Sequence, residues 1–309
     1  MIQITKTLDM LKILFVFMMA LGCSSSDEGS QQDVVIEDPQ GPIEQPDPIS
    51  PYADIDFSHW KITLPVDLNN DNKPDEYQPS QLINQGYQEV EALQPFLYDD
   101  VADTSIVFYT YPAGATTANS SYPRTELREQ QTPGNNYNNW TLNEGGTISG
   151  TLKIADISED HETSRDYHRV IVMQIHGIKS QEDMALHGFD SNHAPPLLKM
   201  TWIDGHIWAY KKHLVNESTS GLDLYDDSSA TWTDIKHDFG YVGFGQFSIE
   251  VIAETGKLTI TANDETYVFE DTSLQKWPFE NYFKAGNYLT ATNSEAFSKI
   301  KYYNLTVTH

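Results

Sequence analysis

The sequence predicts an all-β fold, a β-sandwich of the jelly-roll type. Short runs rich in branched and aromatic residues recur along the chain, and many are bounded by Gly, Asn, Asp or Pro. Aromatic residues, which favour strands, are plentiful, with 17 Tyr and 13 Phe among 309 residues. Helical periodicity is weak, and only Pro79–Gly86 indicates a short helix. Many short strands with few helices are typical of two packed antiparallel sheets.

The strand-like runs extend from residue 105 to the end of the chain. They are 105–111, 123–129, 146–154, 168–176, 197–203, 206–212, 246–253, 257–262, 267–270, 282–288 and 299–308. Two connections, Ile203–His206 and Glu254–Lys257, contain Asp-Gly or Thr-Gly and predict hairpin turns. Nothing in this region repeats at a fixed period.

The chain is strongly acidic, with 45 Asp and Glu against 19 Lys and Arg and a formal net charge of −26. This charge argues against non-specific binding to nucleic acid. It also argues against an anionic ligand, unless the cations gather in one place.

The N-terminus has the pattern of a secretion signal. Lys6 and Lys12 precede an apolar stretch, 13–21, which is too short to span a bilayer at ~20 residues. The run Ala20–Cys23 resembles the end of a bacterial lipoprotein signal, which implies removal of residues 1–22 and lipidation of Cys23. We therefore expect an exported protein, anchored by lipid to the outer membrane or cell surface. The alternative is a plain signal peptide with an incidental cysteine; Cys23 is the only cysteine, so no intramolecular disulfide is possible.

Residues 23–55 predict a disordered tether between the lipidated cysteine and the folded domain. Positions 24–56 hold nine acids and no Lys or Arg, with five prolines between 39 and 51. Low hydrophobicity with charge of one sign keeps such a segment extended. The folded domain is predicted over 56–309, and we expect it to act as a monomer.

The run Arg169–Gly177 begins as a buried strand and ends in polar groups. Because alternate side chains of a strand share a face, Gln174 and His176 point one way and Ile175 the other. An amide beside an imidazole, which titrates near neutral pH, suits proton transfer. A hydrogen-bonded polar pair on a half-exposed sheet is the alternative.

Two further runs carry polar side chains on one face. Arg124, Glu126 and Arg128 share a face of 123–129. Taken alone, this run would be interpreted as a solvent-exposed ladder of charged side chains. In 282–288 the shared face carries Tyr282, Lys284, Gly286 and Tyr288, which alone would be ordinary surface residues. Glycine there allows close approach to the backbone.

Together the three runs offer cations, amides, an imidazole and phenols, but no nucleophile. The sequence has no Gly-x-Ser-x-Gly motif and no His spacing typical of zinc. These groups can neutralise a carboxylate, take the proton beside it and protonate a leaving oxygen. That chemistry is β-elimination from a uronic acid.

The runs Arg124–Arg128, Gln174–His176 and Tyr282–Tyr288, in this order, resemble the three signature motifs of the polysaccharide lyase family 7 alginate lyases. The run Trp60–Pro65 is similar to the start of that family's domain, so the resemblance covers about 56–309. It implies a jelly roll of two curved antiparallel sheets whose concave groove binds alginate. It also implies β-elimination at the 1,4 glycosidic bonds without a cofactor. Thr290 stands where the family usually has Gln, which puts that contact with substrate in doubt.

The resemblance implies a role for each motif residue. Arg124 and Gln174, helped by His176, would neutralise the substrate carboxylate. Tyr288 would protonate the leaving O4 and, by the same resemblance, can also serve as base. In guluronate, where the C5 proton and O4 lie on opposite sides, His176 is the natural base. The neighbouring substrate contacts are assigned to Glu126, which orients the arginines, and to Arg128, Lys284 and Tyr282. Ile175 resembles members that accept guluronate-containing chains.

Two loops carry separate predictions. Asp67, Asn69, Asp71 and Asp75 space oxygen atoms like a calcium loop, although Asn72 replaces the usual Gly and Gln78 the usual Glu. A polar surface loop without calcium is the alternative. The long connection 178–196 could close one end of the groove and favour exolytic cutting over endolytic cutting.

Two other functions remain open at this point. A non-catalytic carbohydrate-binding jelly roll would not require Gln174, His176 and Tyr288 together. A lyase for another polyuronate, such as glucuronan, would use the same chemistry on a different sugar.

Overall fold

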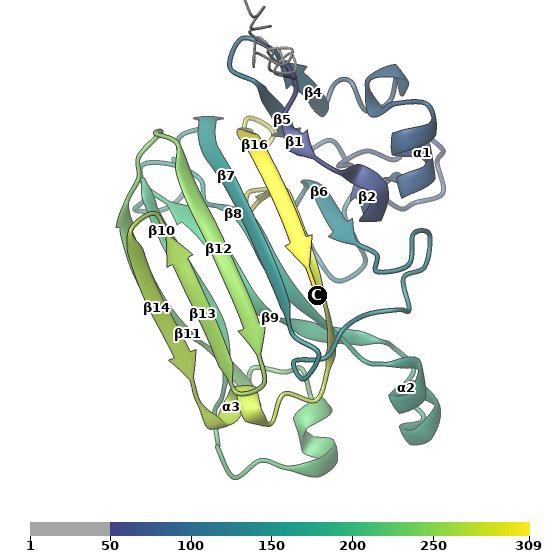
Figure 1. Cartoon of the computed structure of the whole chain (residues 1–309), viewed down its shortest axis with the longest axis vertical. Helices are drawn as coiled ribbons and strands as arrows, with labels where there is room; N and C mark the ends of the chain where they lie inside the picture. The colour runs from purple at the N-terminus through teal and green to yellow at the C-terminus, as the bar shows by residue number, and fades with distance from the viewer. Residues whose placement is uncertain (1–49) are drawn as a thin grey trace, which may run out of the picture. The chain divides into compact units, whose positions relative to one another are not determined.

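The computed structural model describes residues 50–309, which form two packed antiparallel sheets of eight strands each (Figure 1). The predicted signal peptide, Cys23 and most of the predicted tether lie outside the described residues. Pairing begins at Asp54, two residues before the predicted domain boundary. No helix within residues 50–309 is long and apolar enough to cross a membrane.

We call the two sheets the outer sheet and the groove sheet. The outer sheet has the order β14 (Glu265–Glu270), β13 (Lys257–Ala262), β12 (Phe247–Glu254), β7 (Gly146–Ile157), β16 (Ser298–Thr308), β5 (Ser105–Thr110) and β4 (Leu97–Asp100), with β1 (Asp54–Ile55) parallel to β16. The groove sheet has the order β11 (Trp232–Tyr241), β10 (His206–Leu214), β9 (His193–Ile203), β8 (Val170–Ile178), β15 (Glu280–Leu289), β6 (Arg124–Glu129), β2 (Trp60–Thr63) and β3 (Glu76–Tyr77).

Helices are short and lie outside the sheets. They are α1 (Pro79–Asn84), α2 (Gln181–His187) and α3 (Thr272–Gln275), with 3-10 turns η1 (Phe57–His59), η2 (Tyr87–Glu89) and η3 (Gly221–Tyr225). The predicted short helix at 79–86 is confirmed by α1. The predicted loop 178–196 contains α2, which projects from one end of the sandwich in Figure 1. Ser180 caps α2, because its hydroxyl accepts the N–H of Asp183 at 3.0 Å.

The predicted all-β sandwich is confirmed, and each predicted strand run overlaps an observed strand. Both predicted hairpin turns join paired strands: Ile203 pairs with His206, and Glu254 with Lys257. The sequence reasoning missed five strands, the short β1 to β4 and also β11, whose polar run takes its strand form from pairing with β10. Pairing with a neighbouring strand, which acts beyond a single run, supplies these strands.

The core lies between the sheets and follows the alternation of their strands. In β12, Ile249 and Val251 are buried while Glu250 is exposed. Full burial of such a side chain stabilises the fold by roughly 1.5–3 kcal/mol. Trp140, Trp202 and Phe283 are among the largest fully buried side chains. The opposite face of the groove sheet is left free to carry polar groups.

Candidate active site

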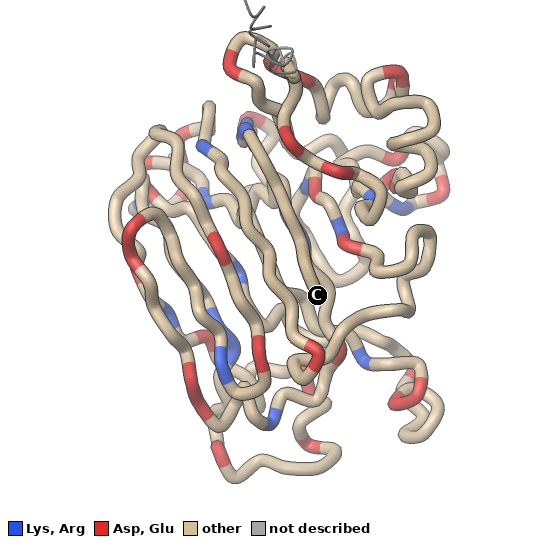
Figure 2. The backbone as a smooth tube through the Cα atoms, viewed as in Figure 1, with Lys and Arg blue, Asp and Glu red and all other residues tan. Residues whose placement is uncertain are grey.

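A groove of about 560 Å³ lies over β6, β8 and β15. The segment Thr117–Ser120 borders it, as do Asn192 and His193. Its lining includes six cations, Lys61, Arg124, Arg128, Arg169, Lys199 and Lys284, and one acid, Glu76. Figure 2 shows acidic residues spread over the loops and strand ends of the fold. The cations are therefore gathered locally, which removes the objection that net charge raised against an anionic ligand.

Strand register brings the three predicted motifs together. Lys284 on β15 lies opposite Gln174 on β8 and opposite Arg128 on β6. Tyr282 lies opposite His176, and Tyr288 opposite Arg124. Neighbouring strands lie ~4.8 Å apart, so these side chains form adjacent rows on one face.

Glu126 is buried beneath the groove and organises the charged side chains above it. Arg124 donates to its Oε2 at 3.1 Å, and Gln174 donates to its Oε1 at 2.6 Å. Lys284 forms an ion pair with the same carboxylate. Burial alone would raise the pKa of Glu126, but the positive charges of Lys284 and Arg124 outweigh it and lower that pKa. Glu126 is thus a carboxylate that fixes three donors.

The predicted role of Glu126 in orienting both arginines differs from its observed contacts. It bonds Arg124 and Lys284, whereas Arg128 donates to the carbonyls of Glu129 and Asn136 and to Asn139, each at 2.8 Å. The Arg128 guanidinium also lies 4.1 Å from the centre of the Tyr282 ring. Arg128 therefore supports the β6 end of the groove through its own set of acceptors.

Lys284 carries a charge that depends on pH near neutrality. Burial lowers the pKa of its ammonium to about 8, although Glu126 acts in the opposite direction. Below that pH, Arg124 and Lys284 against Glu126 leave one net positive charge, which attracts an anion. Above it, the attraction is lost.

We therefore expect kcat/KM toward a polyanionic substrate to fall above pH 8, by about tenfold per pH unit as one proton is lost. A bound carboxylate stabilises the ammonium, so kcat should change less than KM. Arginine stays charged in this range, so kcat/KM of Lys284→Arg should not fall above pH 8. Steady-state rates from pH 6 to 10 measure this. The same fall in both enzymes would assign it to another group.

His176 is held as one tautomer. Its Nδ1 lies 2.8 Å from the carbonyl oxygen of Gly177, which can only accept, so Nδ1 carries the proton and Nε2 keeps its lone pair. The ring stacks on Tyr282 with centroids 5.3 Å apart. Burial, and next the positive charge of Lys284, lower the pKa of His176 to about 3, so the ring is neutral near pH 7. A neutral imidazole can accept a proton.

The Tyr288 hydroxyl is held by a residue that the sequence reasoning missed. Its oxygen lies 2.7 Å from the Ser120 Oγ, in the segment between β5 and β6. The guanidinium of Arg124 lies 3.9 Å from the centre of the Tyr288 ring. The Arg124 Nε is buried and has no hydrogen-bond partner within residues 50–309. The phenol and the guanidinium of Arg124 thus lie side by side.

Tyr302, on the outer sheet, crosses the core and fixes the backbone beneath the groove. Its hydroxyl donates to the Val172 carbonyl at 2.5 Å and accepts the Gly286 N–H at 3.1 Å. These bonds lie where the register of β8 and β15 shifts, between Ala285 and Tyr288. Gly286 has φ +129°, and a Cβ there would lie 2.7 Å from the Thr125 carbonyl oxygen, which requires glycine. No strand motif signals a contact between residues 130 apart.

Tyr302→Phe should lower the free energy of unfolding by roughly 2–4 kcal/mol, because it leaves a buried N–H and a buried carbonyl without their hydrogen-bond partner. Urea denaturation measures the loss. Tyr303→Phe is the matched control, since its hydroxyl bonds Asp103 at 3.2 Å in a partly exposed site. Equal losses in the two variants would contradict the role of the core hydroxyl.

The loop predicted to bind calcium uses its oxygens on its own backbone. Asp67 accepts the N–H groups of Asp71 and Asn72, Asn69 accepts that of Asp71, and Asp75 accepts that of Leu68. In the described part of the chain, no group of three or more His, Cys, Asp or Glu is placed to hold a metal ion. The geometry gives the calcium prediction no support.

Comparisons with known proteins agree with this fold and groove. A family model described as alginate lyase matches residues 55–309. A curated alginate lyase from Klebsiella pneumoniae is 32% identical over 148 residues, which cover 41% of this chain and 46% of the relative. The match thus spans about half the length of that relative.

Solved structures extend the likeness over most of the domain. A family 7 alginate lyase with a Tyr-to-Phe change, in complex with a GGG product, matches with TM-score 0.64 and 29% identity, over 83% of this chain and 97% of that one. An alginate lyase from Pseudomonas aeruginosa matches with TM-score 0.55 and 24% identity, over 82% and 99%, and shows the fold alone. The matches place the chain among the jelly-roll polysaccharide lyases. It belongs to the alginate lyase family, as the sequence motifs predicted.

Proposed function

We propose that this chain cleaves the 1,4 glycosidic bonds of alginate by β-elimination and leaves unsaturated uronate ends. The observation that carries the proposal is the groove itself. A neutral imidazole with a free Nε2 and a phenol share one sheet face with donors fixed on the buried Glu126. A binding module would need no such proton-transferring pair.

The reaction breaks the C5–H bond, whose electrons form the C4=C5 double bond as the C4–O4 bond breaks. Negative charge builds on the carboxylate at C5, where Arg124 and the second N–H of Gln174 would donate. Losing one such donor typically costs ~10²–10³ in rate. His176 or Tyr288 takes the C5 proton, and Tyr288 gives a proton to O4. The bound carboxylate offsets the positive charge of Lys284 and so raises the pKa of His176. His176 is therefore a stronger base once substrate is present.

A related enzyme supports the use of this pair. A family 7 alginate lyase with His-to-Asn and Tyr-to-Phe changes is solved in complex with a substrate, GGMG, at 28% identity to this chain. Intact substrate in such a double variant is what loss of an acid and a base would produce.

The direct test is to incubate the protein with alginate, polymannuronate, polyguluronate and glucuronan and to follow unsaturated uronate absorbance in the ultraviolet. We expect signal on alginate and on guluronate-containing chains. Signal on glucuronan alone would show that glucuronan, and not alginate, is the substrate. No signal on any polymer would favour a binding module.

Exolytic cutting is part of the proposal. It is supported by the 178–196 segment, from which Asn192 and His193 border the groove. A time course on long alginate distinguishes the modes: early monomer or dimer without mid-sized oligomers indicates exolytic cutting, and early mid-sized oligomers indicate endolytic cutting.

Two predictions concern parts of the protein away from the groove. A calcium ion at Asp67, Asn69, Asp71 and Asp75 stays a prediction, which a rise in Tm on adding calcium would support. Anchoring of a monomer through lipid on Cys23, at the outer membrane or cell surface, is supported by the sequence of residues 1–23. Mass spectrometry of the mature N-terminus and sedimentation of the soluble domain test it.

A further inference from the structure

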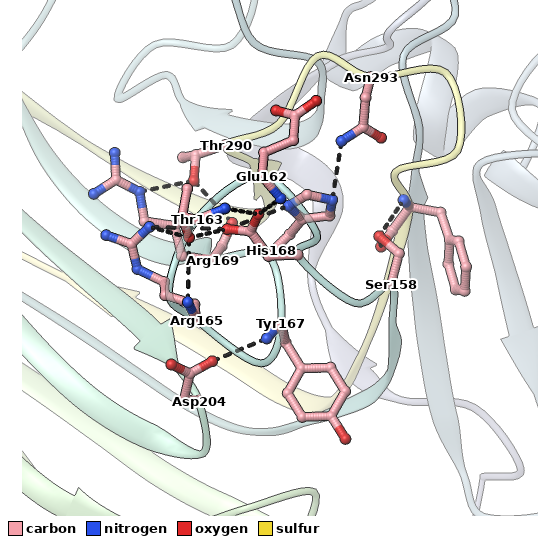
Figure 3. A network of polar contacts seen from close by, with 12 residues as sticks. Ser158, Glu162, Thr163, Arg165, Tyr167, His168, Arg169, Asp204, Thr290 and Asn293 are labelled. Carbon is pink, nitrogen blue, oxygen red and sulfur yellow. Dashed lines mark hydrogen bonds and ion pairs between the residues drawn. The ribbon is translucent and has the colours of Figure 1, made fainter.

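Arg169 and Thr290 form a paired site at the Tyr288 end of the groove. Arg169 directly precedes β8, and Thr290 directly follows β15. The Thr290 hydroxyl donates to the Arg169 carbonyl at 2.9 Å and accepts the Arg169 Nε–H at 2.9 Å, as Figure 3 shows. Threonine thus occupies the position where the sequence departs from the family motif, and it holds an arginine there.

Strand alternation alone would not place Arg169 in the groove. Counting back from Gln174 in steps of two leads to Val172 and Val170, but both are buried in the core. The register of β8 against β9 shifts between Ile171 and Met173, and Ile171 and Arg169 line the groove instead. The shift therefore adds a cation beyond Tyr288.

The other groove cations already have partners. Lys61 pairs with Glu76 at 2.7 Å, Lys199 with Asp234 at 3.2 Å, and Arg124 and Lys284 with Glu126. Arg128 bonds three neutral oxygens.

Arg169 differs from all of these. Within residues 50–309 it has no acidic partner, and its one side-chain bond uses Nε. Both terminal nitrogens remain available for a bidentate contact, the arrangement that suits a carboxylate.

We propose that Arg169, positioned by Thr290, binds the carboxylate of a uronate on the leaving-group side of the scissile bond. The inference rests on the proposed function, in which Tyr288 protonates O4. Tyr288 lies opposite Ile171, and Arg169 and Thr290 come two residues further along the two strands, on the side away from Gln174 and His176. The sugar that departs with O4 lies on that side.

Arg169→Ala should raise KM for alginate by about tenfold, the effect of one lost charge-assisted contact, with kcat within about twofold of wild type. Thr290→Val, which removes only the positioning hydroxyl, should raise KM by a smaller factor. Arg165→Ala is the matched control, because it removes an equal charge four residues away, outside the groove lining. Equal KM values for Arg169→Ala and Arg165→Ala would overturn the inference.

Retention of each variant in gels containing alginate keeps the two proposals separate. An active wild type with no effect of Arg169→Ala on KM or retention rejects the Arg169 site and leaves the lyase proposal standing. An inactive wild type rejects the lyase proposal. In that case weaker retention of Arg169→Ala than of Arg165→Ala still supports a carboxylate site, and equal retention rejects it.

Discussion

Tyr288→Phe should lower kcat on alginate by about 10²–10⁴, the usual contribution of a general acid or base. The change removes one oxygen from a ring that keeps its other contacts, including the Arg124 guanidinium at 3.9 Å. KM should change little, because the groove cations remain in place. Initial rates of absorbance increase measure the effect, with thermal unfolding as the check that the fold is intact.

Tyr122→Phe is the matched control for this experiment. Tyr122 also lines the groove, and its ring lies edge-on to that of Tyr288 with centroids 6.3 Å apart. Its phenol has no part in the proposed chemistry, so its loss should leave kcat nearly unchanged. Near-wild-type turnover in Tyr288→Phe would reject Tyr288 as the acid.

Ser120 refines the same assignment. Its hydroxyl meets the Tyr288 hydroxyl at 2.7 Å and accepts the Tyr122 N–H at 3.1 Å. This contact fixes the direction of the phenolic oxygen, and Ser120 itself has no assigned proton transfer. Ser120 is therefore a positioning residue for Tyr288.

The sequence predicted those parts of the site that alternate along single strands. Gln174 and His176 share the groove face, and Ile175 is fully buried beneath them, because side chains alternate along β8. Order along the chain and motif spacing were enough to find the three central strands.

Residues that depend on contacts between distant segments could not be predicted in this way. Ser120 lies in a loop whose path no periodic pattern describes. Tyr302 acts from the other sheet, and Arg169 reaches the groove only because β8 shifts register. Each of these contacts is decided by packing between elements, which a single run of sequence does not encode.

His176→Gln should distinguish the two sugars of alginate. In polyguluronate the C5 proton and O4 lie on opposite sides, so a separate base is needed, and its loss should cost about 10²–10⁴ in kcat. In polymannuronate the two lie on one side, where Tyr288 alone can serve both steps, so the loss should be much smaller. Glutamine keeps a polar side chain but cannot take up the proton. Rates on the two purified polymers, measured with one enzyme preparation, give the ratio directly.

His193→Gln is the matched control, because its ring also borders the groove, with its centroid 6.3 Å from that of His176. It pairs with Asp227 at 3.5 Å and has no assigned proton transfer. If His176→Gln slows both polymers equally, His176 serves a step common to both sugars and is not the base specific to guluronate. A selective loss on polyguluronate instead assigns the base, because only that sugar presents its C5 proton on the face opposite Tyr288.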